Sequence, residues 1–211
     1  MTILFTIFLS SFIIAFSGAM MPGPLLTATI SESVQRGPMA GPMLILGHAI
    51  LELVLLIALF LGLAPLLSHE IAFVIISLAG GSILIWMAFG MFKSLPTLEL
   101  NLVSEGPSRG HLLKTGILMS LANPYWTIWW ATIGLGLILH SQEKGVPGVL
   151  SFYLGHILAD LVWYAIVSTA IGKGKKFMST RIYRGLIGGC AVILVGFSLF
   201  FIISGFKTLT A

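Results

Sequence analysis

Charged side chains are scarce in this sequence. Asp, Glu, Lys and Arg make up 9% of the 211 residues, whereas a typical soluble domain is about 25% charged. Apolar residues make up 57%, and the mean hydropathy is +1.06. A soluble fold could not bury that much apolar surface. The composition therefore excludes a soluble domain and predicts a multi-pass membrane protein whose main partner is the lipid bilayer.

Cysteine and an early positive charge are also lacking. Cys190 is the single cysteine, so one chain cannot form an internal disulfide or a cysteine-based metal or redox pair. No Lys or Arg precedes the first apolar run, unlike the basic start of a secretory signal, and we expect this segment to be retained as a span. The charges behind the pI of about 9.4 lie in short loops rather than on an amphipathic face, so nucleic acid is not an expected partner.

Apolar runs of membrane length recur along the chain. They fall at approximately 3–30, 41–67, 71–92, 111–139, 146–172 and 185–206. The sequence therefore predicts an all-α integral membrane protein with six transmembrane helices in a single domain, 1–211. The longest polar interval suggests a linker at 94–110, which separates a first half at 1–93 from a second half at 111–211.

The basic residues predict how the chain is oriented. The first, third and fifth loops carry nine of the eleven, namely Arg36, Lys93, Arg109, Lys114, Lys173, Lys175, Lys176, Arg181 and Arg184. The other side has Lys144 and Lys207. Because cytoplasmic loops hold the excess of Lys and Arg, both termini are expected outside a plasma (inner) membrane. With three spans in each half, the two halves would be inserted upside down relative to each other.

A short internal repeat supports this division. Residues 47–53 read Gly-His-Ala-Ile-Leu-Glu-Leu and residues 155–161 read Gly-His-Ile-Leu-Ala-Asp-Leu, at an offset of 108. A proline break precedes the motif in each half, as Pro-Gly-Pro at 22–24 and Asn-Pro at 123–124. Internal similarity between oppositely inserted halves is typical of secondary transporters, whose sites lie near the midplane of the membrane. The sequence thus predicts two inverted three-helix repeats.

Two acidic residues lie well inside apolar runs, and each follows a histidine by four positions. On a helix this spacing puts His48 beside Glu52 and His156 beside Asp160. A carboxylate in mid-membrane costs at least about 2.5 kcal/mol, which favours a proton or cation relay that flanks a substrate site. Interhelical hydrogen bonding is the structural alternative. Two histidines with two acids could also hold a divalent metal ion.

The proline breaks are the second functional signal. Proline frees backbone carbonyls, and irregular backbone persists in a membrane only where it is buried in protein or lines a cavity, where new helix ends suit a substrate carboxylate. A packing kink is the alternative. The tryptophans at 126, 129 and 130 suggest lipid-facing or interfacial aromatics. The predicted substrate or ion site comprises Pro22, Gly23, Pro24, His48, Glu52, Asn123, Pro124, His156, Asp160 and Tyr164.

Three segments carry a resemblance to a known family. They read Ser-Gly-Ala-Met-Met-Pro-Gly-Pro at 17–24, Leu-Ala-Asn-Pro at 121–124, and Gly-His at 155–156 followed by Asp-Leu-Val-Trp-Tyr at 160–164. With these motifs and its span pattern, the sequence resembles the LysE-type (LysE/RhtB) amino-acid exporter family. The resemblance implies export of an amino acid or related metabolite, driven by an ion gradient, from a homodimer. It also implies that the proline breaks and Asp160 are family elements, whereas Glu52 departs from the pattern.

These signals together indicate a secondary transporter that exports an amino acid or similar small polar metabolite by alternating access, coupled to the proton gradient. No nucleophile with an adjacent base is visible at helical spacing, so an enzyme is not expected, and no cofactor is predicted. The alternative function is divalent metal-ion transport through a site made by His48, Glu52, His156 and Asp160.

Overall fold

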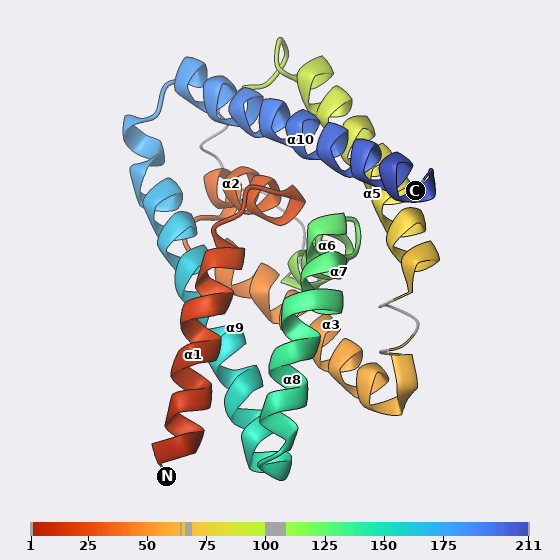
Figure 1. Ribbon diagram of the computed structural model, residues 1–211. Coiled ribbons are helices and arrows are strands. Elements are labelled where there is room, and N and C mark those ends of the chain that lie inside the picture. The colour runs from red at the N-terminus through yellow and green to blue at the C-terminus, as the bar shows by residue number, and fades with distance from the viewer. Residues whose placement is uncertain (1, 64, 66–68, 100–108, 211) are drawn as a thin grey trace.

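The computed structural model describes residues 2–63, 65, 69–99 and 109–210, and this part of the chain is helical with no strand (Figure 1). The elements in chain order are α1 (Thr2–Ala19), α2 (Pro24–Arg36), α3 (Ala40–Ala58), η1 (Leu59–Leu63), α5 (Glu70–Ser94), α6 (Arg109–Leu121), α7 (Pro124–Trp129), η2 (Trp130–Gly134), α8 (Leu135–Gln142), α9 (Gly145–Gly174), η3 (Lys175–Phe177) and α10 (Thr180–Leu209). The expected end of the second span near 67 and most of the predicted linker at 94–110 lie outside the described residues.

Long apolar helices dominate the described chain. Five are long and apolar enough to cross a membrane, at Thr2–Ala19, Ala40–Leu63, Glu70–Ser94, Gly145–Phe177 and Thr180–Leu209. They confirm the expected class of an all-helical integral membrane protein. The expected span at 111–139 is not among them, because it is divided into α6 and the consecutive helical segments α7, η2 and α8.

Both proline motifs break their helices, as their sequences predict. Gly23 is extended, with φ −157 and ψ −172, and Asn123 has φ −95 and ψ 105. The next residue in each case is a proline that opens a new helix, where its missing N–H costs nothing. The residue before a proline is sterically disfavoured in the helical region, so the chain turns at these two points. Each break therefore creates a helix N-terminus inside an apolar segment.

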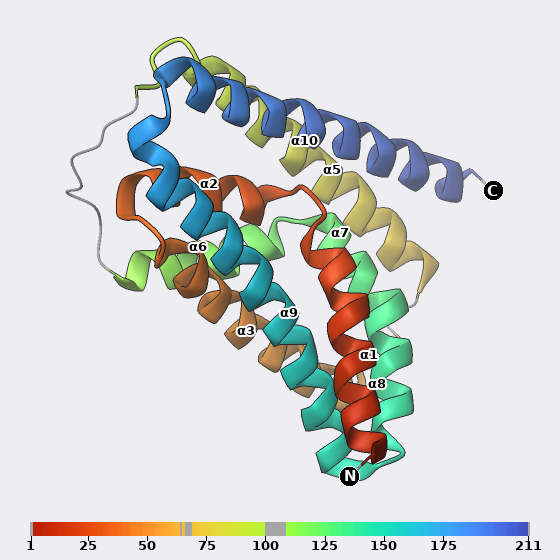
Figure 2. The same ribbon diagram turned by 90° about the vertical axis from the view of Figure 1, so that its left-hand side faces the viewer.

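The helices pack in three long pairs around the short helix α2. α1 lies along α9, α3 along α6, and α5 along α10, and α2 contacts α3, α6, α9 and α10 (Figure 2). α3 and α9, which carry the two Gly-His motifs, also contact each other. This packing brings segments from both halves of the sequence to the centre of the molecule.

The glycine of each Gly-His motif lies against a neighbouring backbone. A Cβ built on Gly47 would lie 2.1 Å from the carbonyl oxygen of Leu113 in α6, and one on Gly155 would lie 2.3 Å from that of Phe8 in α1. Such distances are shorter than van der Waals contact, so only glycine permits this approach. The histidine that follows each glycine is thereby fixed relative to the first helix of the opposite half.

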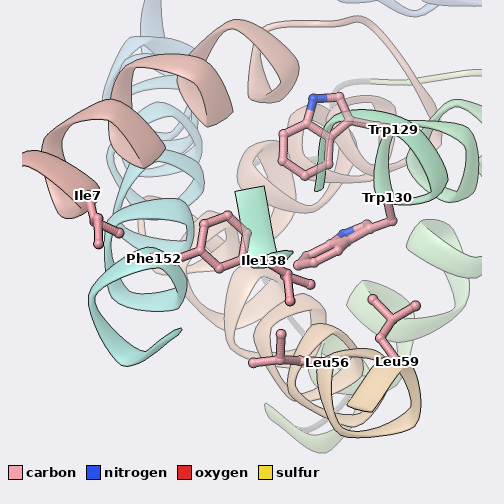
Figure 3. Packing of buried hydrophobic residues seen from close by; sticks show 7 residues of the cluster. All are labelled: Ile7, Leu56, Leu59, Trp129, Trp130, Ile138 and Phe152. Carbon is pink, nitrogen blue, oxygen red and sulfur yellow. The ribbon is translucent and has the colours of Figure 1, made fainter. Parts of the chain in front are cut away.

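An apolar cluster packs at one end of the central region (Figure 3). It comprises Ile7, Leu56, Leu59, Trp129, Trp130, Ile138 and Phe152. Leu56 lies one turn beyond Glu52 on α3, and Phe152 lies one turn before His156 on α9. The cluster therefore covers the side of these residues that faces the N-terminus of α1 and the turn between α8 and α9.

The close glycine contacts predict a stability defect that is specific to position. Gly47→Ala and Gly155→Ala should each lower the stability of the folded protein by about 1–3 kcal/mol, because the added methyl group must displace backbone. The matched control is Gly196→Ala in α10, where a Cβ meets nothing within 4 Å. Thermal unfolding in detergent measures all three variants, and equal midpoints would contradict the packing described here.

Candidate functional site

Four buried ionisable side chains meet where α3 and α9 cross. His48 and Glu52 come from α3, His156 and Asp160 come from α9, and one ligand atom from each lies within 4.8 Å of all the others. The nitrogen Nε2 of His48 is 2.9 Å from Oε1 of Glu52, and Nε2 of His156 is 3.5 Å from Oδ2 of Asp160. The structure thus places both i,i+4 pairs face to face in one cluster.

Contacts also cross between the two helices. Nε2 of His156 is 3.1 Å from Oε2 of Glu52, and Nε2 of His48 is 3.6 Å from Oδ2 of Asp160. Each imidazole therefore lies between both carboxylates. Among the described residues, the ion-pair contacts of Glu52 and Asp160 are all to histidines. Because imidazole can both accept and donate a proton, this arrangement can hold a proton and pass it between carboxylates.

Two tryptophans complete the surroundings of Glu52. The indole nitrogens of Trp126 and Trp130 donate to its Oε1 over 3.0 Å and 2.9 Å. Both residues lie in the helical segment that follows the second proline break, and their spacing of four puts them on one face. An indole N–H can only donate. This oxygen is therefore held as an acceptor, and Glu52 itself is 0% exposed.

Of the interpretations that the sequence leaves open for these aromatics, a lipid-facing or interfacial position is wrong for the buried pair Trp129 and Trp130, which are 6% and 0% exposed. It is also wrong for Trp126, which donates into the site. The physical reason is the carboxylate, because a buried anion requires donors and the indoles supply them. The spacing of Trp126 and Trp130, directly after Asn123-Pro124, was the signal in the sequence that could have placed both in the site.

The two histidines have different surroundings. The ring of His156 packs against Trp129, Trp130 and Phe152, with centroids 4.8, 5.3 and 6.0 Å away. Its Nδ1 has no hydrogen-bond partner among the described residues. Nδ1 of His48 instead lies 2.7 Å from Oγ of Ser120, on α6. No sequence signal pointed to Ser120.

A small cavity opens beside the cluster at the meeting of the two breaks. It leaves about 60 Å³ in which the centre of a water-sized molecule can lie, and one water needs about 10–15 Å³ of such space. Seven of the predicted site residues line it, namely Gly23, His48, Glu52, Asn123, His156, Asp160 and Tyr164. Pro22, Pro24 and Pro124 do not line the cavity. Pro24 and Pro124 begin the helices α2 and α7 at its edge.

The breaks themselves touch each other. A Cβ on Gly23 would lie 3.1 Å from Nδ2 of Asn123. Oδ1 of Asn123 accepts from the backbone N–H of Tyr125 at 3.1 Å, so the amide group turns its N–H donors toward Gly23. The cavity therefore has a backbone break from each half of the chain at its wall.

Asp160 supplies an acceptor that makes no hydrogen bond. Its Oδ2 is buried and has no hydrogen-bond donor among the residues that the structure describes, although Nε2 of His156 and Nε2 of His48 lie 3.5 and 3.6 Å away. Buried polar atoms normally have a hydrogen-bond partner, and one without a partner at a cavity wall points to a ligand or a transferred proton. Asp160 can therefore receive a proton, an ammonium group or a metal ion without first losing a hydrogen bond.

Comparison with known proteins gives matches along nearly the whole chain. The family model described as LysE type translocator matches residues 16–205. The chemotactic transduction protein ChpE of Pseudomonas aeruginosa is 27% identical over 197 residues, which cover 90% of this chain and 94% of that protein. YcgF of Bacillus subtilis, a candidate amino acid efflux protein, is 22% identical over 205 residues, which cover 96% and 98%.

A third relative matches over a shorter stretch. The homoserine/homoserine lactone efflux protein of Salmonella typhi is 29% identical over 124 residues, which cover 56% of this chain and 60% of that protein. No solved structure matches the chain.

The indole contacts predict that Trp130 stabilises the site through its N–H group. Trp130→Phe keeps a ring but removes a donor to a buried carboxylate, and this should cost roughly 1.5–3 kcal/mol. Trp86→Phe is the matched control, because Trp86 is 74% exposed and has no such acceptor to lose. Thermal unfolding in detergent compares the two, and a loss no larger in Trp130→Phe than in the control would refute this role.

Proposed function

Because the chain belongs to the LysE type translocator family, we propose that it exports an amino acid or a similar small polar metabolite across the plasma membrane, coupled to the proton gradient. Membership makes the chain a membrane transporter rather than an enzyme. The names of two relatives concern efflux, of homoserine and its lactone in one case and of amino acids in the other. The buried cavity between the two helix breaks is the observation that carries the proposal.

The cavity offers complementary groups to the two ends of an amino acid. Asp160 presents a carboxylate oxygen that accepts no hydrogen bond from the described residues, which suits an ammonium group. At the other wall α2 begins after Gly23, and the first N–H groups of a helix have no partner within it. Such a helix start, together with the amide donors of Asn123, suits a carboxylate. The volume of about 60 Å³ favours a small substrate.

Proton coupling is supported by the contacts among the four ionisable residues. Imidazole nitrogens lie between 2.9 and 3.6 Å from carboxylate oxygens of both helices. Ionisable groups are rare inside membrane proteins and mark ion pathways. A proton that reaches Asp160 can therefore pass through an imidazole to Glu52, or leave when the substrate ammonium takes its place.

An inverted repeat of three and three helices is supported by the pattern of helix contacts. When the two halves are exchanged, α1 corresponds to α6, α3 to α9, α5 to α10, and α2 to the segment that α7 and α8 form together. The contact of α1 with α9 then matches that of α6 with α3, the contact of α2 with α3 matches that of α8 with α9, and the contact of α2 with α10 matches that of α7 with α5. The contacts of α2 with α6 and α9 have no counterpart of similar extent among the described residues. Inverted repeats of this kind allow alternating access around a central site. We propose a homodimer on the family resemblance alone.

Divalent metal transport is the second candidate, and one observation favours it. Four ligand atoms from His48, Glu52, His156 and Asp160 lie within 4.8 Å of one another, a donor set that divalent metals accept. The two indole donors on Oε1 of Glu52 weigh against it, because a metal bound there would have to displace them or use the other oxygen. We therefore rank amino-acid export first.

Flux through Asp160→Asn tests the proposed relay. The purified protein in proteoliposomes, with an imposed proton gradient, should move one or more members of an amino-acid panel that includes homoserine. Asn keeps the shape but cannot take up a proton, so gradient-driven flux should fall roughly tenfold or more. A purely structural role predicts near-normal flux, because hydrogen bonds in membranes average only about 0.6 kcal/mol.

The control for this substitution is Glu143→Gln, which removes an acid whose side chain is 62% exposed. Thermal unfolding of both variants shows whether a fall in flux comes from the missing proton carrier or from a destabilised protein. Wild-type flux in Asp160→Asn would reject the relay. Flux of divalent metals without any flux of amino acids would reject the first candidate in favour of the second.

The orientation follows from where the basic ends lie. Arg36, Lys93 and Lys173 are in the last turns of α2, α5 and α9. Those three ends lie on the left and upper left in Figure 2, while both termini and the turn between α8 and α9 lie toward the bottom and right. We propose that the basic end is cytoplasmic and that both termini are outside.

A reporter joined after the C-terminus tests this orientation. An enzyme that is active only in the periplasm should give signal there, and one that is active only in the cytoplasm should give none. The same two reporters placed in the turn between η3 and α10 should show the reverse pattern. Strong cytoplasmic signal from the C-terminal fusion would show that the proposed orientation is wrong.

A further inference from the structure

Ser120 occupies a fixed place between α6 and α3. A Cβ built on Gly116 would lie 2.0 Å from the carbonyl oxygen of Leu44, so the two helices are in backbone contact there. Ser120 lies one turn after Gly116, and His48 lies one turn after Leu44. The same contact therefore brings the Ser120 hydroxyl to Nδ1 of His48, at 2.7 Å, with both residues buried.

The hydrogen bonds of this serine leave one consistent arrangement of protons. Oγ of Ser120 also lies 2.7 Å from the carbonyl oxygen of Gly116. A carbonyl can only accept, so the single hydroxyl hydrogen goes to Gly116. Oγ then has only lone pairs for His48. At 2.7 Å, Nδ1 of His48 must therefore carry a hydrogen and donate it to Ser120.

We propose that Ser120 is a positioning residue that fixes the tautomer of His48, with its permanent proton on Nδ1, so that Nε2 is the atom that exchanges the transported proton. The tautomer stands on geometry alone, and its role in transport rests on the proposed function. Nε2 lies 2.9 Å from Oε1 of Glu52 and 3.6 Å from Oδ2 of Asp160. With Nδ1 already protonated, a single proton bound at Nε2 can pass to either oxygen.

The groups around His48 agree with this assignment. Glu52 and Asp160 face Nε2, the ring of His156 lies across the cluster, and Tyr164 lines the same cavity. Oε1 of Glu52 already accepts from two indoles, so it is an acceptor and not a donor toward Nε2 of His48. At 2.9 Å a proton on Nε2 is shared with this oxygen, and the Nδ1-protonated tautomer is the neutral ring that remains when this proton leaves.

Among the described residues, His156 has no counterpart of the hydrogen bond between Ser120 and His48. The contacts of Gly47 with Leu113 and of Gly155 with Phe8 make Ala15 the counterpart of Ser120, and Ala15 is buried but has no hydroxyl. Nδ1 of His156 correspondingly has no partner among the described residues. The two histidines are therefore unequal, because only His48 is held in one tautomer by a hydrogen bond.

The test is ¹⁵N NMR of the full-length protein labelled at histidine, in nanodiscs. The five histidines give few signals, and His48→Gln identifies that of His48. Protonated and unprotonated imidazole nitrogens differ strongly in ¹⁵N shift, so the spectrum reports the tautomer directly. In the wild-type protein Nδ1 of His48 should carry a proton. At a pH where the His48 ring is neutral, a large fraction of Ser120→Ala should be in the other tautomer, because the acceptor for Nδ1 is gone.

Two variants separate positioning from general packing. Ser120→Thr keeps a hydroxyl and should restore the wild-type signal. Ser198→Ala removes another fully buried serine, one that donates to Gly81 between α10 and α5, and should leave His48 unchanged. If Ser120→Thr does not fold, the comparison of Ser120→Ala with Ser198→Ala still decides whether Ser120 positions His48 or only fills space.

Flux measured on the same samples connects the tautomer to transport. Gradient-driven flux should fall several-fold in Ser120→Ala and recover in Ser120→Thr. An unprotonated Nδ1 in the wild-type protein, or a spectrum of Ser120→Ala identical to wild type, would overturn the proposal. Wild-type protein that shows the expected tautomer but no coupled flux would instead reject the proposed function and leave the tautomer standing.

Discussion

A buried carboxylate sets the main constraint on this structure. Glu52 is fully enclosed in an apolar bundle, where an unpaired charge would be very costly. Its stabilising groups come from three different helical segments, namely His48 on its own helix, His156 on α9, and the two indoles that follow the second break. The site therefore holds together the helices that surround it. The break at Asn123 helps to supply these donors, because it redirects the chain so that the indoles reach the carboxylate.

Glycine contacts make this convergence possible. Gly47 and Gly116 bring α3 and α6 into backbone contact, and Gly155 does the same for α9 and α1. Because lipid offers little hydrophobic drive for helices to associate, close packing supplies much of their attraction. The distances within the ionisable cluster are then set by backbones in contact rather than by flexible side chains. Such rigidity suits a site that must present particular nitrogen atoms to particular oxygen atoms.

The sequence could predict the parts of this site that depend on local spacing. Four-residue spacing placed Glu52 beside His48, and the prolines predicted both helix breaks. The sequence could not predict contacts that depend on how separate helices pack against each other. Ser120 reaches His48 only because Gly116 lies against Leu44, and no local pattern records that approach. Trp126 and Trp130 are four residues apart, so they lie on one face of their helical segment. The same aromatics would suit a lipid-facing surface, and only the position of Glu52 distinguishes that surface from the site. The break at Asn123 divides the expected fourth span, which is not among the five uninterrupted spans found in the described residues.

Trp130 contributes both to the apolar cluster and to the surroundings of Glu52. Its ring packs in the apolar cluster that covers one end of the cavity (Figure 3). Its N–H group donates to Glu52. Any motion that opened the cavity toward that end would have to separate this cluster and shift the indole. The same motion would withdraw a donor from Glu52 and weaken its hold on negative charge. Such an opening and the affinity of Glu52 for a proton would therefore be coupled through the side chain of Trp130.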